Sequence, residues 1–332
     1  MRLAPDSCYA YYFSRISPAH RETYRHMYRG LHSRRARIHV QTQDRVDTVH
    51  SILAYVLLDH PKLFFVDASQ FDYRASGNAI ELRVRYLYSR NAIRGIQELV
   101  DESTASLLSA APHRSTCPLH MERFLYQTIA RNTRYSGEEV ARAADHSILG
   151  PLLNGTAVCE GYAKALKYLC DAVSLPCIVA RGTASGLQGE GAEPHAWNIL
   201  KLQGKYYHCD VTWDSILGGD EVLHPDYFNL SDEEMRKDHT WGADPLPLCN
   251  HTYTDVPYVV DQRDFARRLH NCLTQGERRL AVRFRTFPER DSDIVDLVCS
   301  IIDRFPAPAR AKVSNVKVRY NRTQNKALIT FL

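Results

Sequence analysis

One cysteine in this chain stands where its thiol could become chemically reactive. Cys159 follows the small-residue loop Asn154–Val158 and precedes Ala163 and Leu166, which begin an apolar face at helical spacing. The start of a helix offers unpaired N–H groups and the positive end of the helix dipole, and both favour the thiolate form of a cysteine. We therefore expect Cys159 at a helix N-terminus, where it could attack a carbonyl group.

A hairpin predicted downstream carries a histidine and an aspartate. Residues 195–202 and 205–213 alternate as strands do, and Gln203-Gly204 between them suits a two-residue turn. This turn pairs the strands so that His195 and Asp210 share one face as diagonal neighbours. A register slip of two residues keeps them on that face, whereas a slip of one would separate them.

A cysteine enzyme needs a base beside the thiol and a carboxylate that orients the base. Cys159, His195 and Asp210 supply these three groups in chain order. Asp214 is an alternative carboxylate, although the predicted pairing puts it beyond the end of the hairpin. We expect the first three residues to form a triad.

Four neighbours of these residues are candidates for contacts with a substrate. Trp197 and Trp213 could line a pocket for the acyl group, although large aromatic residues in a hairpin also form plain core. Glu160 and Tyr162 follow the cysteine and could border the cleft, with simple solvent exposure as the alternative. The glycine-rich stretch 182–194 lacks the strand-to-helix context of a phosphate loop, so we expect a flap beside the cleft.

The sequence shows no spacing typical of a metal or cofactor site. His208 and Cys209 flank Asp210 and suggest a metal ion shared with Cys159, but no CxxC or HxxxH pair accompanies them. A DxDxDG pattern for calcium is also missing. We therefore expect neither a metal nor a cofactor.

The elements around the candidate triad mix helices with antiparallel strands. An amphipathic helix is predicted over residues 118–135, the cysteine helix over 159–173, and strands over 177–184, 195–202 and 205–213. Ser231 and Glu234 have the spacing of a capping box and predict a further short helix. A helix backed by an antiparallel sheet makes this segment α+β.

The two flanking segments resemble each other. Residues 18–100 and 261–332 each read as helix, strand, helix and a strand pair, which is an αβαββ order. The first strand pair is predicted over 64–73 and 79–88, around a turn at 74–78. We interpret the two segments as an internal repeat, although αβαββ is common enough to recur by coincidence. The predicted domains are 1–112, 113–260 and 261–332.

Three motifs together resemble those of the transglutaminase-like (transglutaminase core) superfamily, of bacterial type. They are VCEGYAKAL at 158–166, HAWN at 195–198 and YYHCDVTWD at 206–214, in the family's order and spacing. The resemblance covers about residues 118–240 and implies a papain-like core, here flanked by the two small αβαββ modules. It further implies that Cys159 is the nucleophile, His195 the general base and Asp210 the residue that orients it.

This resemblance fixes the chemistry better than the substrate, because the superfamily includes crosslinkers, cysteine proteases and peptide deglycosylating enzymes. We expect a cysteine-dependent acyl-transfer enzyme that acts on peptide or side-chain amides through a thioester on Cys159. Hydrolysis is preferred over crosslinking, since no calcium pattern supports a calcium-gated crosslinker. The alternative is a binding or scaffold protein with a vestigial core, in which the flanking modules contact protein partners.

The composition indicates which classes of partner and which cellular compartment to expect. The 332 residues include 42 lysines and arginines against 38 aspartates and glutamates, which gives no reason to expect nucleic acid. The longest apolar run, residues 51–58, is far shorter than the ~20 residues of a membrane span. Nine cysteines without a CxxC pair fit reduced thiols, and the N-terminus has no apolar stretch typical of a signal peptide. We expect a cytoplasmic protein, although a trimmed leader would leave no trace.

Overall fold

The computed structural model describes nine stretches of the chain. They are residues 8–111, 117–137, 140–185, 191–218, 225–242, 244–254, 256–284, 291–306 and 313–332. Among these residues, no helix combines the length and the hydropathy that crossing a bilayer requires. The centre of the predicted flap, residues 186–190, lies outside the described residues.

The N-terminal segment combines helices with a three-stranded antiparallel sheet of order β1-β3-β2. Its elements are α1 (Tyr11–Arg15), α2 (Pro18–His32), β1 (Arg37–Gln41), α3 (Val46–Asp59), β2 (Asp72–Ser76), β3 (Ala79–Arg83) and α4 (Arg90–Ser109). The sequence did not reveal α4, whose first turn is capped by the Ser89 hydroxyl, an acceptor for the Ala92 N–H.

The predicted strand over residues 64–73 is wrong except at its end, where Asp72 and Tyr73 begin β2. A 3₁₀ turn at Pro61–Leu63 precedes it, and Phe64 and Phe65 are buried after that turn instead of alternating along a strand. The hairpin turns at Gly77-Asn78, and Ser76 pairs with Ala79. Gly77 has a φ of +57°, a left-handed conformation that glycine adopts without strain.

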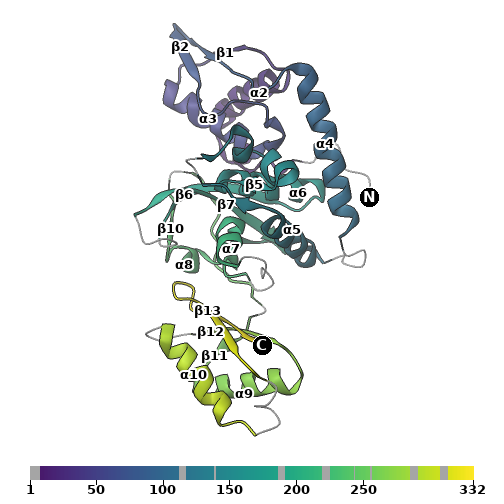
Figure 1. Cartoon of the computed structure of the whole chain (residues 1–332). Coiled ribbons are helices and arrows are strands. Elements are labelled where there is room, and N and C mark those ends of the chain that lie inside the picture. The colour runs from purple at the N-terminus through teal and green to yellow at the C-terminus, as the bar shows by residue number, and fades with distance from the viewer. Residues whose placement is uncertain are drawn as a thin grey trace.

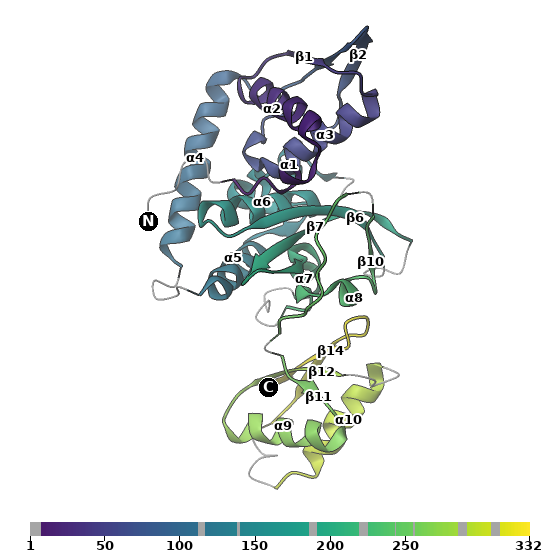
Figure 2. The same ribbon diagram turned by 180° about the vertical axis from the view of Figure 1, so that it is seen from behind.

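The central segment is built around a five-stranded sheet of order β10-β6-β7-β8-β9, with antiparallel neighbours (Figure 1). Its helices are α5 (Pro118–Asn132), α6 (Cys159–Ala172), α7 (Val211–Gly218) and α8 (Asp232–Met235), with short helical turns at Ala143–His146 and Gly150–Asn154. Its strands are β4 (Arg134–Tyr135), β5 (Thr156–Ala157), β6 (Cys177–Ala184), β7 (Glu193–Leu202), β8 (Lys205–Cys209), β9 (Phe228–Leu230) and β10 (His239–Thr240). Helix α6 lies between the N-terminal helices and the sheet (Figure 2). The predicted α+β architecture therefore describes this core.

The C-terminal segment forms a second small sheet of order β11-β12-β14-β13. Its elements are β11 (Tyr258–Val259), α9 (Gln262–Thr274), β12 (Arg279–Phe284), α10 (Asp291–Asp303), β13 (Val316–Asn321) and β14 (Lys326–Phe331). The strand order β12-β14-β13 matches the order β1-β3-β2 of the N-terminal sheet. That the two segments superpose as a repeat stays a prediction, as do the predicted domain boundaries.

The segments are joined in different ways. The N-terminal and central segments share one hydrophobic core, in which Leu53 and Val100 pack with Leu125 and Leu166. The C-terminal segment has its own core, and its β13–β14 hairpin points toward α8 (Figure 1). The C-terminal segment therefore adds a separately packed unit at the edge of the central sheet.

Candidate active site

The cysteine singled out in the sequence begins helix α6. Val158, the residue before the helix, provides no side-chain cap, so the first N–H groups of α6 have no partner within the helix. The Val158 N–H donates to the Asp145 carbonyl at 3.1 Å. Gly161 permits this approach, because a Cβ there would lie 2.1 Å from the Asp145 carbonyl oxygen. Cys159 itself is 7% exposed, so its thiol is largely shielded from solvent.

His195 and Asp210 meet beside this cysteine. His195 lies on β7, and its Nε2 atom is 2.7 Å from Asp210 Oδ2. Cys159 interacts with the same ring and helps to raise the pKa of His195. The structure thus brings together the three residues predicted as a triad.

Asp210 reaches His195 by a route that differs from the predicted one. The register predicted from the turn is confirmed as far as the pairing of Asn198 with Cys209, but β8 ends there. Asp210 instead precedes α7, and its Oδ1 accepts from the N–H groups of Thr212 at 3.0 Å and Trp213 at 3.2 Å. The predicted strand pairing of residues 210–213 is wrong, because the carboxylate satisfies the first N–H groups of a helix. Both oxygens of Asp210 are therefore held.

Burial and the neighbouring charges have opposite effects on the pKa values of His195 and Asp210. Burial lowers the pKa of His195, but the Asp210 carboxylate and the interaction with Cys159 raise it to about 10. Burial raises the pKa of Asp210, but His195 and His239 more than offset this and hold it well below its usual range. At neutral pH the pair is therefore an imidazolium and a carboxylate.

A second histidine on Asp210 was not predicted from the sequence. His239 on β10 places Nε2 3.1 Å from Asp210 Oδ2, and Nδ1 2.6 Å from Asp238 Oδ1. The centroids of the His239 and His195 rings lie 5.4 Å apart. The sequence gives no spacing signal for this residue, because β10 has only two residues and reaches the site by pairing with β6. Asp238 and His239 thus extend the candidate triad.

Two groups of described residues gather enough ligand atoms to be compared with metal sites. They are His195, Asp210 and His239, and His208, Asp232 and Cys249. Two ligands of a tetrahedral zinc ion, each ~2.0–2.1 Å from the metal, would lie about 3.3 Å apart. The pairs His195–Asp210 and His208–Asp232 are closer, at 2.7 and 2.8 Å, and these are hydrogen-bond distances. These contacts fit hydrogen-bonded chains better than metal ligand sets.

Both tryptophans predicted to line the site contact the His195 ring. The Trp197 ring is 16° from parallel to it at a centroid distance of 6.2 Å, and the Trp213 ring lies at 5.9 Å. The indole N–H of Trp197 donates to His208 Nδ1 at 2.9 Å, which fixes the indole. Both side chains are buried and enclose the imidazole. A contact with substrate stays a prediction.

The other two predicted substrate contacts differ in exposure. Glu160 is half-buried and pairs with Lys164 at 2.7 Å and His146 at 3.6 Å. Burial raises the pKa of Glu160, but Lys164 and His146 lower it to about 2. Tyr162 is fully buried, and its hydroxyl donates to the Thr133 carbonyl at 2.7 Å. Tyr162 therefore presents no accessible surface to a substrate in this structure.

Replacing Tyr162 by phenylalanine should affect stability and leave the reactivity of the thiol unchanged. We expect Tyr162→Phe to lower the free energy of unfolding by about 0.5–1.5 kcal/mol, because the Thr133 carbonyl loses one donor and keeps the Ser215 hydroxyl. The rate of alkylation of Cys159 should stay at the wild-type value, since the hydroxyl faces away from the site. Urea unfolding and alkylation kinetics measure the two effects. Slower alkylation at unchanged stability would instead support a place in the cleft.

The alternative carboxylate, Asp214, faces a different part of the core. It accepts from the hydroxyl of Tyr126 on α5 and from the N–H groups of Asp226 at 2.6 Å and Tyr227 at 3.0 Å. Burial and the neighbouring Asp226 raise the pKa of Asp214 to about 7. Its carboxylate is thus occupied in the core, and Asp210 is the one that bonds to His195.

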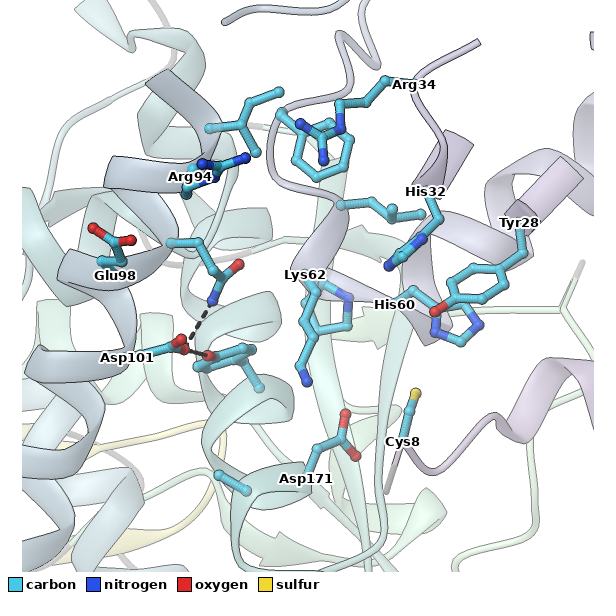
Figure 3. Close-up of a pocket in the computed structure, with 17 residues that line it drawn as sticks. Cys8, Tyr28, His32, Arg34, His60, Lys62, Arg94, Glu98, Asp101 and Asp171 are labelled. Carbon is cyan, nitrogen blue, oxygen red and sulfur yellow. Dashed lines mark hydrogen bonds between the residues drawn. The ribbon is translucent and has the colours of Figure 1, made fainter. Parts of the chain in front are cut away.

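A cavity of about 950 Å³ lies away from this site, between the N-terminal helices, α4 and α6 (Figure 3). Arg34 and Arg94 lie toward one end of the cavity, Cys8 and Asp171 toward the other, and Lys62 between them. None of the three triad residues lines it. The cavity and the candidate active site are therefore separate features.

Comparison with known proteins agrees with the family resemblance of the core. Residues 109–211, which include all three triad positions, match the family model described as the transglutaminase-like superfamily. The kyphoscoliosis peptidase of Mus musculus is 24% identical over 151 residues, which are 43% of this chain and 22% of that protein. The chain thus spans about a fifth of this relative's length.

Solved structures show only a distant likeness. The crystal structure of a TGase is 14% identical, over 53% of this chain and 50% of the other, with a TM-score of 0.29. A putative cysteine protease from Cytophaga hutchinsonii is 13% identical, over 43% of this chain and 61% of the other, with a TM-score of 0.27.

Proposed function

We propose that this chain, whose segment 109–211 belongs to the transglutaminase-like superfamily, is a cysteine-dependent acyl-transfer enzyme for peptide or side-chain amides. One observation carries the proposal. Cys159 stands at the start of α6 and interacts with His195, whose Nε2 lies 2.7 Å from the buried Asp210 carboxylate. A nucleophile, a base and an orienting carboxylate in this geometry support covalent catalysis.

In the proposed reaction, His195 already holds the thiol proton as an imidazolium, and the Cys159 thiolate attacks the amide carbonyl carbon. The carbon–nitrogen bond breaks, the imidazolium gives its proton to the leaving amine, and the acyl group remains as a thioester. Neutral His195 then removes a proton from water or an amine, which attacks the thioester and releases the thiol. Asp210 holds the ring and stabilises its cationic form throughout.

The start of α6 also supports stabilisation of the negative charge that develops on the carbonyl oxygen. The Cys159 N–H has no partner within the helix, and the positive end of the helix dipole faces the same place. One such donor contributes ~3–4 kcal/mol to the transition state in comparable enzymes.

Hydrolysis is the preferred outcome within this proposal. The mouse relative is named a peptidase, which supports water as the acceptor. The substrate would be a protein or peptide, and the flanking segments would contribute contacts with protein partners.

Trapping the acyl-enzyme tests the proposal. Incubation with peptides from a cell extract, acid quenching and mass spectrometry should find an acyl group on Cys159 and none on Cys299, which is the exposed cysteine of α10. A primary amine added before quenching should appear in the released product if the thioester passes to amines. Cys159→Ala should lose the adduct, and Cys299→Ala should keep it.

The same experiment distinguishes the alternative class of function. A binding or scaffold protein with a vestigial core would carry no acyl group on Cys159 from any peptide. Its Cys159 would also react with iodoacetamide no faster than Cys299. Those two results together would reject acyl transfer.

A further inference from the structure

His239 lies between two carboxylates. Its Nδ1 faces Asp238 Oδ1 at 2.6 Å and its Nε2 faces Asp210 Oδ2 at 3.1 Å. Ionised carboxylates only accept hydrogen bonds, so both ring nitrogens must donate. Only the doubly protonated ring has two donors. The contacts therefore describe His239, which is 1% exposed, as a buried imidazolium.

The surroundings of His239 balance this charge. The titratable groups that face it are Asp210, Asp238, His195, His208 and Tyr227. The Tyr227 hydroxyl donates to Asp238 Oδ2 at 2.6 Å, which fixes that carboxylate against the ring. Asp238 thus neutralises His239, and the charge of Asp210 is shared between His239 and His195.

The C-terminal hairpin completes this support. Gln324, between β13 and β14, donates through Nε2 to Asp238 Oδ2 at 3.3 Å and to the Glu234 carbonyl at 3.2 Å. Two acceptors around one amide nitrogen fix its orientation. Beside it, Lys326 Nζ donates to the Pro225 carbonyl at 2.8 Å and to the Asp226 carbonyl at 2.7 Å. The hairpin is thereby held against the segment that carries Asp238 and His239.

We propose that His239 is a positioning residue for Asp210, and that Gln324 makes the C-terminal hairpin part of this support. The proposal rests on the proposed acyl-transfer function. As a cation beside Asp210, His239 holds the carboxylate in place and takes up part of its charge. The His195 imidazolium is then a readier proton donor to the leaving amine, and the nearby positive charge also favours the thiolate of Cys159.

A change of pH profile would separate this role from a merely structural one. In His239→Gln, a nearby cation is lost, so a higher pH is needed to form the thiolate. We expect the acid limb of the alkylation rate of Cys159 to move up by roughly 0.5–1 pH unit. On the acid limb the rate should fall about 3–10-fold, while the plateau at higher pH changes little. If the acid limb of alkylation in His239→Gln lies at the same pH as in the wild type, the proposal is overturned, whether or not the plateau rate is lower.

A second measurement needs no substitution at a buried position. With labelled histidine in the wild-type chain, nitrogen chemical shifts should assign His239 to a doubly protonated ring at pH 7. A neutral His239 ring would overturn the proposal. Neither measurement uses a substrate, so a wild type that alkylates rapidly but hydrolyses nothing would count against the proposed function alone.

The role of the hairpin has a matched pair of variants. Gln324→Ala removes the donor to Asp238, whereas Lys317→Ala changes an exposed residue on β13 of the same hairpin. We expect Gln324→Ala to slow alkylation of Cys159 on the acid limb about 2–5-fold, and Lys317→Ala to leave the rate unchanged. Equal rates in the two variants would remove the hairpin from the proposal.

Discussion

His195→Ala should slow the alkylation of Cys159 at pH 6 by about 100-fold or more. With the imidazolium present, the sulfur is held as a thiolate at this pH. Without it, no neighbouring group holds the thiol proton, so the less reactive thiol form predominates at pH 6. Rates followed by mass spectrometry, cysteine by cysteine, measure the effect. Hydrolysis of any substrate should fall by a similar or larger factor, because the proton acceptor is also lost.

The control for this variant is a histidine away from the site. His39 on β1 has a side chain that is 62% exposed, so His39→Ala should alkylate at the wild-type rate. The other eight cysteines supply an internal reference within each sample. If His195→Ala reacts as fast as the wild type, helix α6 alone activates the thiol and the histidine has no part in it.

Asp210→Asn should be among the most destabilising single changes in the core. The carboxylate is fully buried, accepts from two histidines and two backbone N–H groups, and begins α7. Breaking a buried ion pair by removing one partner costs about 3–5 kcal/mol, because the other charge is left uncompensated. Denaturant unfolding of the wild type and the variant at pH 6 measures the loss. A loss below about 1 kcal/mol would show that the histidines are neutral in the folded protein.

The pH dependence of this loss follows from the two pKa shifts. The pKa of Asp210 is lowered by folding, so its contribution is present above the unfolded value near ~3.9 and disappears as the pH falls. The pKa of His195 is raised to about 10, so its contribution is complete below ~6.5 and is lost as the pH rises through 10. The difference in stability between wild type and Asp210→Asn should therefore be largest from pH ~4 to ~6.5 and shrink toward pH 10.

Most of the features that could be predicted from the sequence depend on patterns of neighbouring residues. The turn at Gln203-Gly204 has φ angles of +49° and +83°, and it sets the register of β7 and β8 as expected. The capping box of Ser231 and Glu234 forms as its spacing indicates. The cysteine helix begins at Cys159. Each of these features depends on residues only a few positions apart.

The features that were missed depend on contacts between distant residues. Alternating side chains favoured a strand through Trp213, but Asp210 caps a helix whose place is fixed by packing against α5. His239 reaches the site because β10 pairs with β6, residue 239 opposite residue 184. Phe64 and Phe65 are buried directly after a 3₁₀ turn and do not lie in a strand. No spacing within the sequence could reveal these long-range contacts.

The anchoring of the C-terminal hairpin has a consequence for the order in which the protein is made. During synthesis, residues 159, 195 and 210 emerge from the ribosome well before Lys326. The Nζ atom of Lys326 donates hydrogen bonds to the Pro225 and Asp226 carbonyls. While a nascent chain lacks the hairpin, the segment around Asp238 and His239 has no partner on that side. The thiol of Cys159 would thus reach its full reactivity only after most of the chain had been synthesised and folded. Late completion would lower the reactivity of this thiol while the nascent chain is still unfolded.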